Sequence, residues 1–251
     1  MAKEFTFKKF HINAFECGMP VSTDAVLLGA WANIKQSKSI LDIGCGTGLL
    51  AIMCAQRNLT AKITAVEIEK NAFHAAQLNC FNSPWSDRLN VKHIAIEDFV
   101  KIVFSLNQQE APYFDSIICN PPYFNHGEES RNNQRAVARH TSKLTHSDLL
   151  NYCNKLLKLQ GTASFILPRE EGLALLRLLL DFSQSDSNFH LQLSRLTYVK
   201  TTSTKAAKRV LIELVKEMTV VQHTEKEMII HDGDNYSAAF IALTGAFYLK
   251  M

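Results

Sequence analysis

The chain has 251 residues, 47% of them hydrophobic and 20% charged, which is enough apolar material for the core of an α/β domain. Its formal net charge of +3 is too small to indicate a partner by itself. The first residues lack the apolar stretch of a signal peptide, and no run of about 18 apolar residues predicts a membrane span. The six cysteines form no Cys-x-x-Cys pair, so we expect reduced thiols in a cytoplasmic protein that needs no metal.

Short apolar runs alternate with longer segments at helical spacing, a pattern typical of parallel α/β folds. The expected strands are, in chain order, 39–43, 62–68, 90–96, 114–119, 162–167, 189–199 and 208–215. The expected helices are 49–56, 70–82, 146–159 (stopped by Gly161), 170–182 and 236–249, with one more that opens at Thr23-Asp24. No repeat or low-complexity linker divides the chain. We therefore expect one domain over residues 1–251, with an N-terminal extension (1–38) and a helical C-terminal extension (232–251).

A glycine-rich turn follows the first of the longer expected strands and opens a helix. Its glycines permit a tight turn and a close approach of the backbone to a ligand. Glu67 ends the next strand, where a carboxylate can accept hydrogen bonds from ribose hydroxyls. The spacing Gly-x-Gly-x-Gly after Asp42 differs from the dinucleotide fingerprint, and an acid at this place suits the ammonium group of S-adenosylmethionine better than a pyrophosphate. The expected cofactor-binding residues are Asp42, Gly44, Cys45, Gly46, Gly48, Glu67 and Ile68.

The tetrapeptide Asn120-Pro121-Pro122-Tyr123 follows the expected strand 114–119. The side-chain oxygen of Asn120 and the carbonyl of Pro121 are suited to accept the two N–H hydrogens of an exocyclic amine and so to orient its nitrogen. The two prolines stiffen the segment. Tyr123 offers a ring on which a base can stack, an interaction worth about 1–3 kcal/mol. We expect these four residues to form a transfer site in which no strong base is needed.

Both segments resemble known methyltransferase motifs. The run 41–48 is similar to motif I of class I methyltransferases, and the tetrapeptide is similar to motif IV of the amino-group enzymes, which act on adenine N6, guanine N2 or glutamine N5. The resemblance implies a Rossmann-like α/β fold with a mostly parallel seven-stranded sheet flanked by helices, and it assigns Glu67 to the cofactor ribose. The family's acid after the third strand falls on Ala95 here. The nearest acids are Glu97 and Asp98, and we take Asp98 as the candidate for binding the adenine.

Basic residues gather in three places. Arg131, Arg135, Arg139 and Lys143 follow the tetrapeptide, Lys8 and Lys9 lie near the start, and Lys200, Lys205, Lys208 and Arg209 form another cluster. Such residues neutralise phosphates when they flank a base pocket, although each cluster alone also fits a solvated surface. The expected RNA-binding residues are Arg131, Arg135, Arg139, Lys143, Lys8 and Lys9. Thr23-Asp24 is interpreted as a helix N-cap that either presents Asp24 or backbone to the methionine end of the cofactor or is an ordinary cap.

Taken along its whole length, the sequence resembles the bacterial tRNA(Val) adenine-37 N6-methyltransferase family. The matching segments are 5–8, 23–31, 41–48, 82–85, 120–123, the arginine-rich stretch to Arg139, 235–237 and 247–249. The resemblance implies methylation of N6 of the adenosine beside the anticodon. We expect the chain to bind tRNA and to be a monomer. The alternatives are a glutamine N5-methyltransferase, a guanine N2-methyltransferase acting on ribosomal RNA, and an RNA-binding module without enzymatic activity. The glutamine enzymes usually carry a separate N-terminal helical domain, and a binding module would not bind S-adenosylmethionine.

Overall fold

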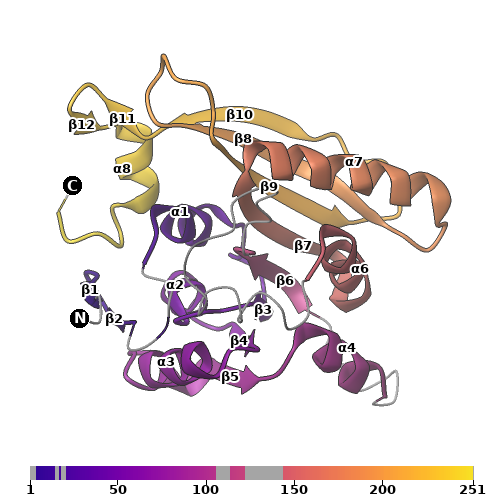
Figure 1. Cartoon of the computed structure of the whole chain (residues 1–251), viewed down its shortest axis with the longest axis horizontal. Helices are drawn as coiled ribbons and strands as arrows, with labels where there is room; N and C mark the ends of the chain where they lie inside the picture. Colours follow the sequence, from indigo (N-terminus) through magenta and orange to yellow (C-terminus); the bar gives the residue numbers. More distant parts are fainter. Residues whose placement is uncertain (1–3, 15–16, 18–20, 106–113, 122–143, 251) are drawn as a thin grey trace, which may run out of the picture.

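The structure is a computed structural model that describes residues 4–14, 17, 21–105, 114–121 and 144–250. Its centre is an eight-stranded sheet in the order β10-β8-β9-β7-β6-β3-β4-β5, with helices on both faces (Figure 1). The strands of this sheet are β3 (Ser39–Ile43), β4 (Lys62–Glu67), β5 (Leu89–His93), β6 (Phe114–Cys119), β7 (Leu157–Pro168), β8 (Leu191–Lys200), β9 (Arg209–Lys216) and β10 (Thr224–Ile229). The helices are α1 (Thr23–Trp31), α2 (Leu49–Arg57), α3 (Lys70–Phe81), α4 (Ile96–Ser105), α6 (His146–Leu156), α7 (Arg169–Ser185) and α8 (Ala238–Thr244).

The sheet reverses its direction of growth between β3 and β6. From β3 the chain moves outward through β4 to β5, and it then returns to place β6 on the other side of β3. All strands run parallel except β9, which is antiparallel to both β7 and β8. Open α/β sheets bind ligands at the carboxyl ends of the strands where such a reversal occurs. The topology therefore places the candidate site beside the ends of β3 and β6.

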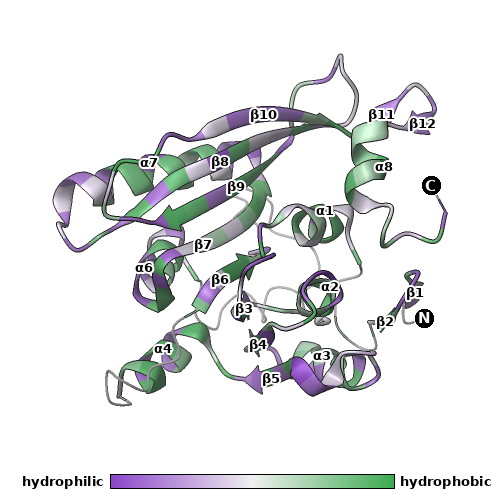
Figure 2. Cartoon of the chain, turned by 180° about the vertical axis from the view of Figure 1, so that it is seen from behind, coloured by the Kyte–Doolittle hydropathy of each residue, from purple (hydrophilic) through white to green (hydrophobic). Residues whose placement is uncertain are grey.

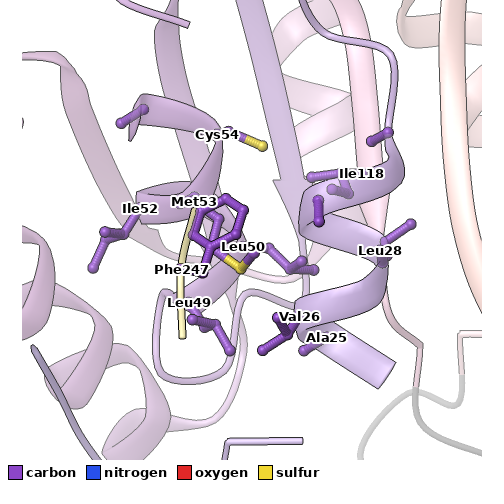
Figure 3. Close-up of a cluster of buried hydrophobic side chains, with 14 of the residues drawn as sticks. Ala25, Val26, Leu28, Leu49, Leu50, Ile52, Met53, Cys54, Ile118 and Phe247 are labelled. Carbon is purple, nitrogen blue, oxygen red and sulfur yellow. The ribbon is translucent and has the colours of Figure 1, made fainter. Parts of the chain in front are cut away.

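Two clusters of buried apolar side chains hold the helices on the two faces of the sheet. One joins the sheet to α1, α2 and α3, and the other joins it to α4, α6 and α7. Every residue of α1 from Ala25 to Trp31 is buried, as expected of a helix enclosed by its neighbours. Gly29 brings α1 close to α2, because a Cβ atom there would lie 2.7 Å from the sulfur of Met53. Figure 3 shows the side chains of α1 and α2 in this cluster together with Phe247 from the C-terminal segment.

The N-terminal hairpin and the C-terminal segment pack against each other. β1 (Glu4–Thr6) pairs with β2 (His11–Asn13), and the backbone N–H of Lys8 donates to the carbonyl of Phe247 over 2.8 Å. The ammonium of Lys8 also donates to the carbonyl of Gly245. Phe7 stacks on Phe10 with their ring centroids 4.5 Å apart, within the same apolar cluster as Phe247. None of the helices in the described ranges has the length and apolarity needed to cross a membrane.

The α/β class with a mostly parallel sheet is confirmed, but the sheet has an eighth strand. That strand, β10, was missed because it lies at the edge of the sheet and carries the sequence Thr-Glu-Lys-Glu-Met-Ile, with its first four residues exposed. Charged residues are common on edge strands, and they hide the apolar pattern that marks interior ones. Figure 2 shows β10 as largely hydrophilic at the edge of the sheet, whereas β9, the second strand in from it, is largely hydrophobic.

Several predicted boundaries are wrong. The helix that starts at His146 ends at Leu156, not at residue 159, because Leu157 already pairs with Phe114 as the first residue of β7. Gly161 therefore lies within a strand and does not stop a helix. The strand expected over 90–96 ends at His93, and Ile96 opens α4, which the sequence did not predict. The C-terminal helix is confined to Ala238–Thr244, preceded by the small hairpin of β11 (His231–Asp232) and β12 (Asn235–Tyr236).

Candidate functional site

The glycine turn between β3 and α2 depends on backbone conformations that only glycine adopts easily. Gly44, Gly46 and Gly48 have φ values of 67°, 55° and 81°. The N–H groups of Gly44 and Cys45 both donate to the carbonyl of Val66, which ties the turn to the end of β4. A Cβ atom on Gly44 would meet no atom within 4 Å among the described residues, so the backbone there faces open space. At this point a ligand can approach the main chain closely.

Gly48 has a different structural role in the same turn. It is the residue that caps α2, and a Cβ atom on it would lie 3.3 Å from Cα of Ala76 and 3.2 Å from the sulfur of Cys80, both in α3. The third glycine thus lets two helices pack closely behind the turn. The first glycine leaves the turn open to a ligand, and the third one supports it from the protein side.

The carboxylate of Glu67 lies at the end of β4 and is bound by backbone amides. One oxygen accepts a 2.9 Å hydrogen bond from the N–H of Gly46, and the other accepts from the N–H groups of Ile68 and Glu69 at 2.9 Å each. The residue is 8% exposed. These bonds orient the carboxylate at the mouth of the turn, the place from which an acid can bind ribose hydroxyls.

Asp42 is fully buried behind the turn, and its two carboxylate oxygens differ in their hydrogen bonding. Its Oδ2 accepts from the N–H of Ala51 over 3.0 Å, whereas its Oδ1 is buried and makes no hydrogen bond to any described residue. Burial raises the pKa of this carboxyl from its ordinary value of 3.8 to about 8; the bond from Ala51 opposes the rise, and the charge of Glu67 adds to it. A buried acceptor of this kind is costly unless a donor satisfies it. A cationic donor, such as an ammonium group, fits this place.

Two of the four predicted transfer residues are described. Asn120 is half-buried and Pro121 is buried, both directly after β6. Because Ile43 and Cys119 are paired in register as the last residues of β3 and β6, Gly44 and Asn120 leave the sheet side by side. The register therefore brings the glycine turn and the start of the tetrapeptide together. Pro122 and Tyr123 lie outside the described residues.

The other predicted cofactor residues differ in how they are held. Ile68 directly follows Glu67 and is 44% exposed, so an apolar side chain is available at this edge of the sheet. The carbonyl of Ile68 lies 3.0 Å from Nε2 of His93. Asp98 is an exposed residue in the first turn of α4, and it pairs with Lys101 at 3.0 Å. No hydrogen bond joins Asp98 to the described part of the glycine turn. Its assignment to the cofactor stays a prediction.

The start of α1 corrects one prediction and adds a residue. The N-cap is Ser22, whose hydroxyl accepts from the N–H of Ala25; Thr23 and Asp24 are the first helical residues, so the interpretation of Thr23-Asp24 as the cap is wrong. The carboxylate of Asp24 accepts a 2.7 Å hydrogen bond from Nε of Arg209, at the beginning of β9. This ion pair fixes α1 to the carboxyl edge of the sheet. Sequence reasoning missed it because the two residues are 185 positions apart.

The predicted RNA-binding residues are described only in part. Arg131, Arg135, Arg139 and Lys143 lie outside the described residues. Lys9 is exposed, and Lys8 is exposed but already donates to the carbonyl of Gly245, which gives it a structural task between the two ends of the chain.

Comparisons with known proteins give a consistent result. The model of the family "Methyltransferase small domain" matches residues 22–150. A tRNA1(Val) (adenine(37)-N6)-methyltransferase of Aliivibrio fischeri is 49% identical over 251 residues, covering 100% of both chains. One of the same name from Vibrio parahaemolyticus is 49% identical over 99% of this chain and 97% of its own.

Solved structures resemble the fold at low identity. A predicted O-methyltransferase from Agrobacterium tumefaciens has a TM-score of 0.63 at 18% identity and covers 89% of this chain and 96% of its own. An O-methyltransferase from Bacillus cereus in complex with SAH has a TM-score of 0.54 at 14% identity and covers 80% of this chain and 84% of its own. At these identities the likeness shows a shared fold, that of the methyltransferases.

Proposed function

The chain belongs to the family of tRNA1(Val) (adenine(37)-N6)-methyltransferases, and on this premise we propose that it transfers a methyl group from S-adenosylmethionine to N6 of adenosine 37 in tRNA. The observation that carries the proposal is the register of β3 and β6, which sets the open backbone of Gly44 beside Asn120. This register supports a cofactor site and an amine-orienting site that are adjacent at one edge of the sheet.

The residues around the glycine turn fit the proposed cofactor. When bound, S-adenosylmethionine supplies an electrophilic methyl group on a sulfonium. The buried Oδ1 of Asp42 is an acceptor for its ammonium, and Glu67 is an acceptor for its ribose hydroxyls. The backbone at Gly44, Cys45 and Gly46 forms the floor, Gly48 supports that floor from the protein side, and Ile68 offers apolar surface. Thr23, Asp24 and Asp98 complete the proposed set, and the carboxylates of Asp24 and Asp98 also pair with Arg209 and Lys101.

Asn120 and Pro121 are proposed to hold the amine of the target base. The lone pair of an exocyclic adenine nitrogen is delocalised into the ring, so the nitrogen must be oriented before it reacts. Acceptors for its two hydrogens achieve this without removing a proton, since the nitrogen becomes acidic only as its new bond forms. Positioning of this kind can supply a large part of the rate enhancement. Pro122 is proposed to stiffen the segment and Tyr123 to stack on a base that has left its helical stack.

Removal of the Asn120 amide is the direct test. We expect Asn120→Ala to reduce methyl transfer about 100-fold or more while cofactor affinity stays within a factor of about two, because the hydrogen bond to the amine matters mainly near the transition state. Asn33→Ala is the matched control, since Asn33 is an exposed asparagine after α1. The assay uses tRNA from a strain lacking the gene, labelled cofactor, and mass spectrometry of the digested nucleosides.

Each outcome of this assay decides something. N6-methyladenosine at position 37 supports the proposal. Label on a release-factor glutamine or on guanine in ribosomal RNA would keep the enzyme class and overturn the substrate. An Asn120→Ala protein with full activity would overturn the role of the tetrapeptide. A wild-type protein that binds neither S-adenosylmethionine nor its demethylated product in calorimetry would indicate a binding module without enzymatic activity.

The tRNA is proposed to meet Arg131, Arg135, Arg139 and Lys143 near the transfer site, and Lys8 and Lys9 at the N-terminal hairpin. If the three arginines meet phosphates, their joint replacement by alanine should make the slope of log affinity against log salt shallower by about 0.7–0.9 for each phosphate that is no longer neutralised. A slope equal to that of the wild type would leave the stretch as a solvated surface.

We further propose that the chain works as a monomer in the cytoplasm, without a metal, as one catalytic domain over residues 1–251 with extensions at 1–38 and 232–251. The packing of the N-terminal hairpin on the C-terminal segment supports a single unit. Light scattering during gel filtration tests the oligomeric state, and activity in excess chelator tests the need for a metal. A dimer, or loss of activity in chelator, would contradict the respective statement.

A further inference from the structure

The connection between β8 and β9 lies at the same edge of the sheet as the transfer site. β9 is paired with β7 so that Arg209 lies opposite Pro168, and β7 is paired with β6, which leads into Asn120. With neighbouring strands about 4.8 Å apart, the start of β9 is two strands, or about 10 Å, from the line of β6. Residues 201–208 therefore border the place where a target base would enter.

The ends of this connection are fixed by backbone hydrogen bonds. The N–H of Lys208 donates to the carbonyl of Val199 over 3.2 Å, and the N–H of Arg169 donates to the carbonyl of Lys208 over 3.1 Å. At the other end, the N–H of His231 donates to the carbonyl of Thr201 over 2.9 Å. The loop is thereby tied to the start of α7 and to the β11–β12 hairpin. Its side chains are presented from a defined backbone.

The four cations of this region divide into two kinds. Lys200 pairs with Glu227 at 2.7 Å, and Arg209 pairs with Asp24 at 2.7 Å. Lys205 and Lys208 are exposed, and neither forms an ion pair with any carboxylate in the described part of the chain. The positive charge left without compensation is thus concentrated on the loop itself.

The remaining side chains of the loop are small, and several are hydroxyls. Residues 201–208 read Thr-Thr-Ser-Thr-Lys-Ala-Ala-Lys, with no acid and no large apolar residue. A turn closed by the bond from the N–H of Lys205 to the carbonyl of Thr202 brings the hydroxyls of Thr202 and Thr204 within 3.3 Å of each other. Lysines, hydroxyls and free backbone N–H groups are the donors that bind phosphate oxygens in protein–nucleic acid complexes. Small side chains let a sugar–phosphate chain approach them.

We propose that the loop of residues 201–208 binds the phosphate backbone of the RNA strand that carries the target base, with Lys205 and Lys208 as its charged donors. The inference rests on the proposed function, and it adds a binding surface outside the tetrapeptide and the arginine-rich stretch. Asp232 and Asp234 lie in the neighbouring hairpin and would repel phosphates. The bound strand therefore runs from the loop toward Asn120, away from that hairpin.

The test compares two pairs of lysines. Lys205→Ala with Lys208→Ala removes the proposed phosphate donors, and Lys35→Ala with Lys62→Ala removes two exposed lysines near the amino ends of β3 and β4. For the first pair we expect the slope of log tRNA affinity against log salt to become shallower by about 1.4–1.8. The KM for tRNA should rise about fivefold to thirtyfold with kcat nearly constant. The control pair should leave both values unchanged.

Further measurements separate the possible failures. Calorimetry with S-adenosylhomocysteine should give the wild-type affinity for both variants, and Lys205→Arg with Lys208→Arg should keep the wild-type slope. An unchanged slope and KM in the first pair, with a wild type that methylates tRNA, would overturn the proposal for the loop alone. An equal effect in the control pair would overturn it as well. A wild type that neither binds nor methylates tRNA would overturn the proposed function and this inference together.

Discussion

Two stretches at the carboxyl ends of the parallel strands differ in the sign and the burial of their charged side chains. In the glycine stretch (residues 42–48 and 67–69), the side chains of Asp42 and Glu67 are acids, buried, and bonded to backbone N–H groups. In the lysine stretch (residues 200–209), Lys205 and Lys208 are exposed cations. Fixed, buried acceptors suit a small ligand that must be held in one orientation. Exposed cations suit a polyanion whose affinity comes from many weak interactions. Asn120 follows β6, between the strands that carry the two stretches.

The largest expected difference between the stretches comes from removing one carboxylate. Glu67→Ala should weaken binding of S-adenosylmethionine by about 1.5–3 kcal/mol, because charge-assisted bonds to the ribose can no longer form. Asp234→Asn removes an exposed carboxylate beside the lysine stretch and should leave that affinity unchanged. Calorimetry measures both.

Because Glu67 also accepts from three backbone N–H groups, its replacement could act through the fold. Glu67→Gln keeps the size of the side chain and one acceptor oxygen, and its free energy of unfolding in urea controls for this effect. Wild-type affinity in a folded Glu67→Ala protein would contradict the role of the acid.

A second contrast concerns glycines with positive φ in the two regions. Gly48→Ala should lower the free energy of unfolding by about 2–3 kcal/mol, since it combines a left-handed conformation with a Cβ atom 3.3 Å from the backbone of Ala76. Gly233→Ala, in the hairpin beside the lysine stretch, has φ of 59° but open space around the new atom, and it should cost only about 1 kcal/mol. Equal decreases in the free energy of unfolding would show that the contact of the new Cβ atom with α3 adds no cost at Gly48.

The third contrast is in pH dependence and centres on Asp42. Its pKa of about 8 in the folded chain exceeds the ordinary 3.8, so between these values the folded state holds a proton that the unfolded state has released. Stability should therefore fall as the pH rises through this window, by at most about 1.4 kcal/mol per pH unit, and Asp42→Asn should flatten the fall. The free energy of unfolding at pH 6, 7 and 8 measures it.

The affinity for the cofactor should also depend on the ionisation of Asp42, but it should change with pH in the direction opposite to stability. An ammonium binds the ionised carboxylate, so affinity should increase from pH 6 to 8 and binding at pH 7 should release a proton. Calorimetry in buffers of different ionisation enthalpy detects that proton. A Lys205→Ala, Lys208→Ala protein should keep this dependence, and its disappearance there would contradict the separation of the two stretches.

Much of this arrangement follows from local sequence, and the failures have physical causes. Strands β3 and β6 were predicted with their observed bounds, because helices on both faces of a sheet require short, mostly apolar strands with polar segments on either side. The charged edge strand β10 and the end of α6 were not predicted. Leu156 ends α6 and Leu157 begins β7 with no glycine or proline between them, so no local signal marks the change, and pairing with Phe114 decides where it occurs.

Local sequence alone accounts for the α/β class, the glycine turn with its two acids, and the tetrapeptide, because each depends on residues that are neighbours in the chain. Three-dimensional packing was needed to establish that Gly44 and Asn120 leave the sheet side by side, that Asp42 keeps one buried acceptor, and that Arg209 pairs with Asp24. It also showed that, of the four cations in residues 200–209, Lys205 and Lys208 have no carboxylate partner among the described residues. These facts depend on strand order, register and burial, which are set by interactions between residues far apart in the chain.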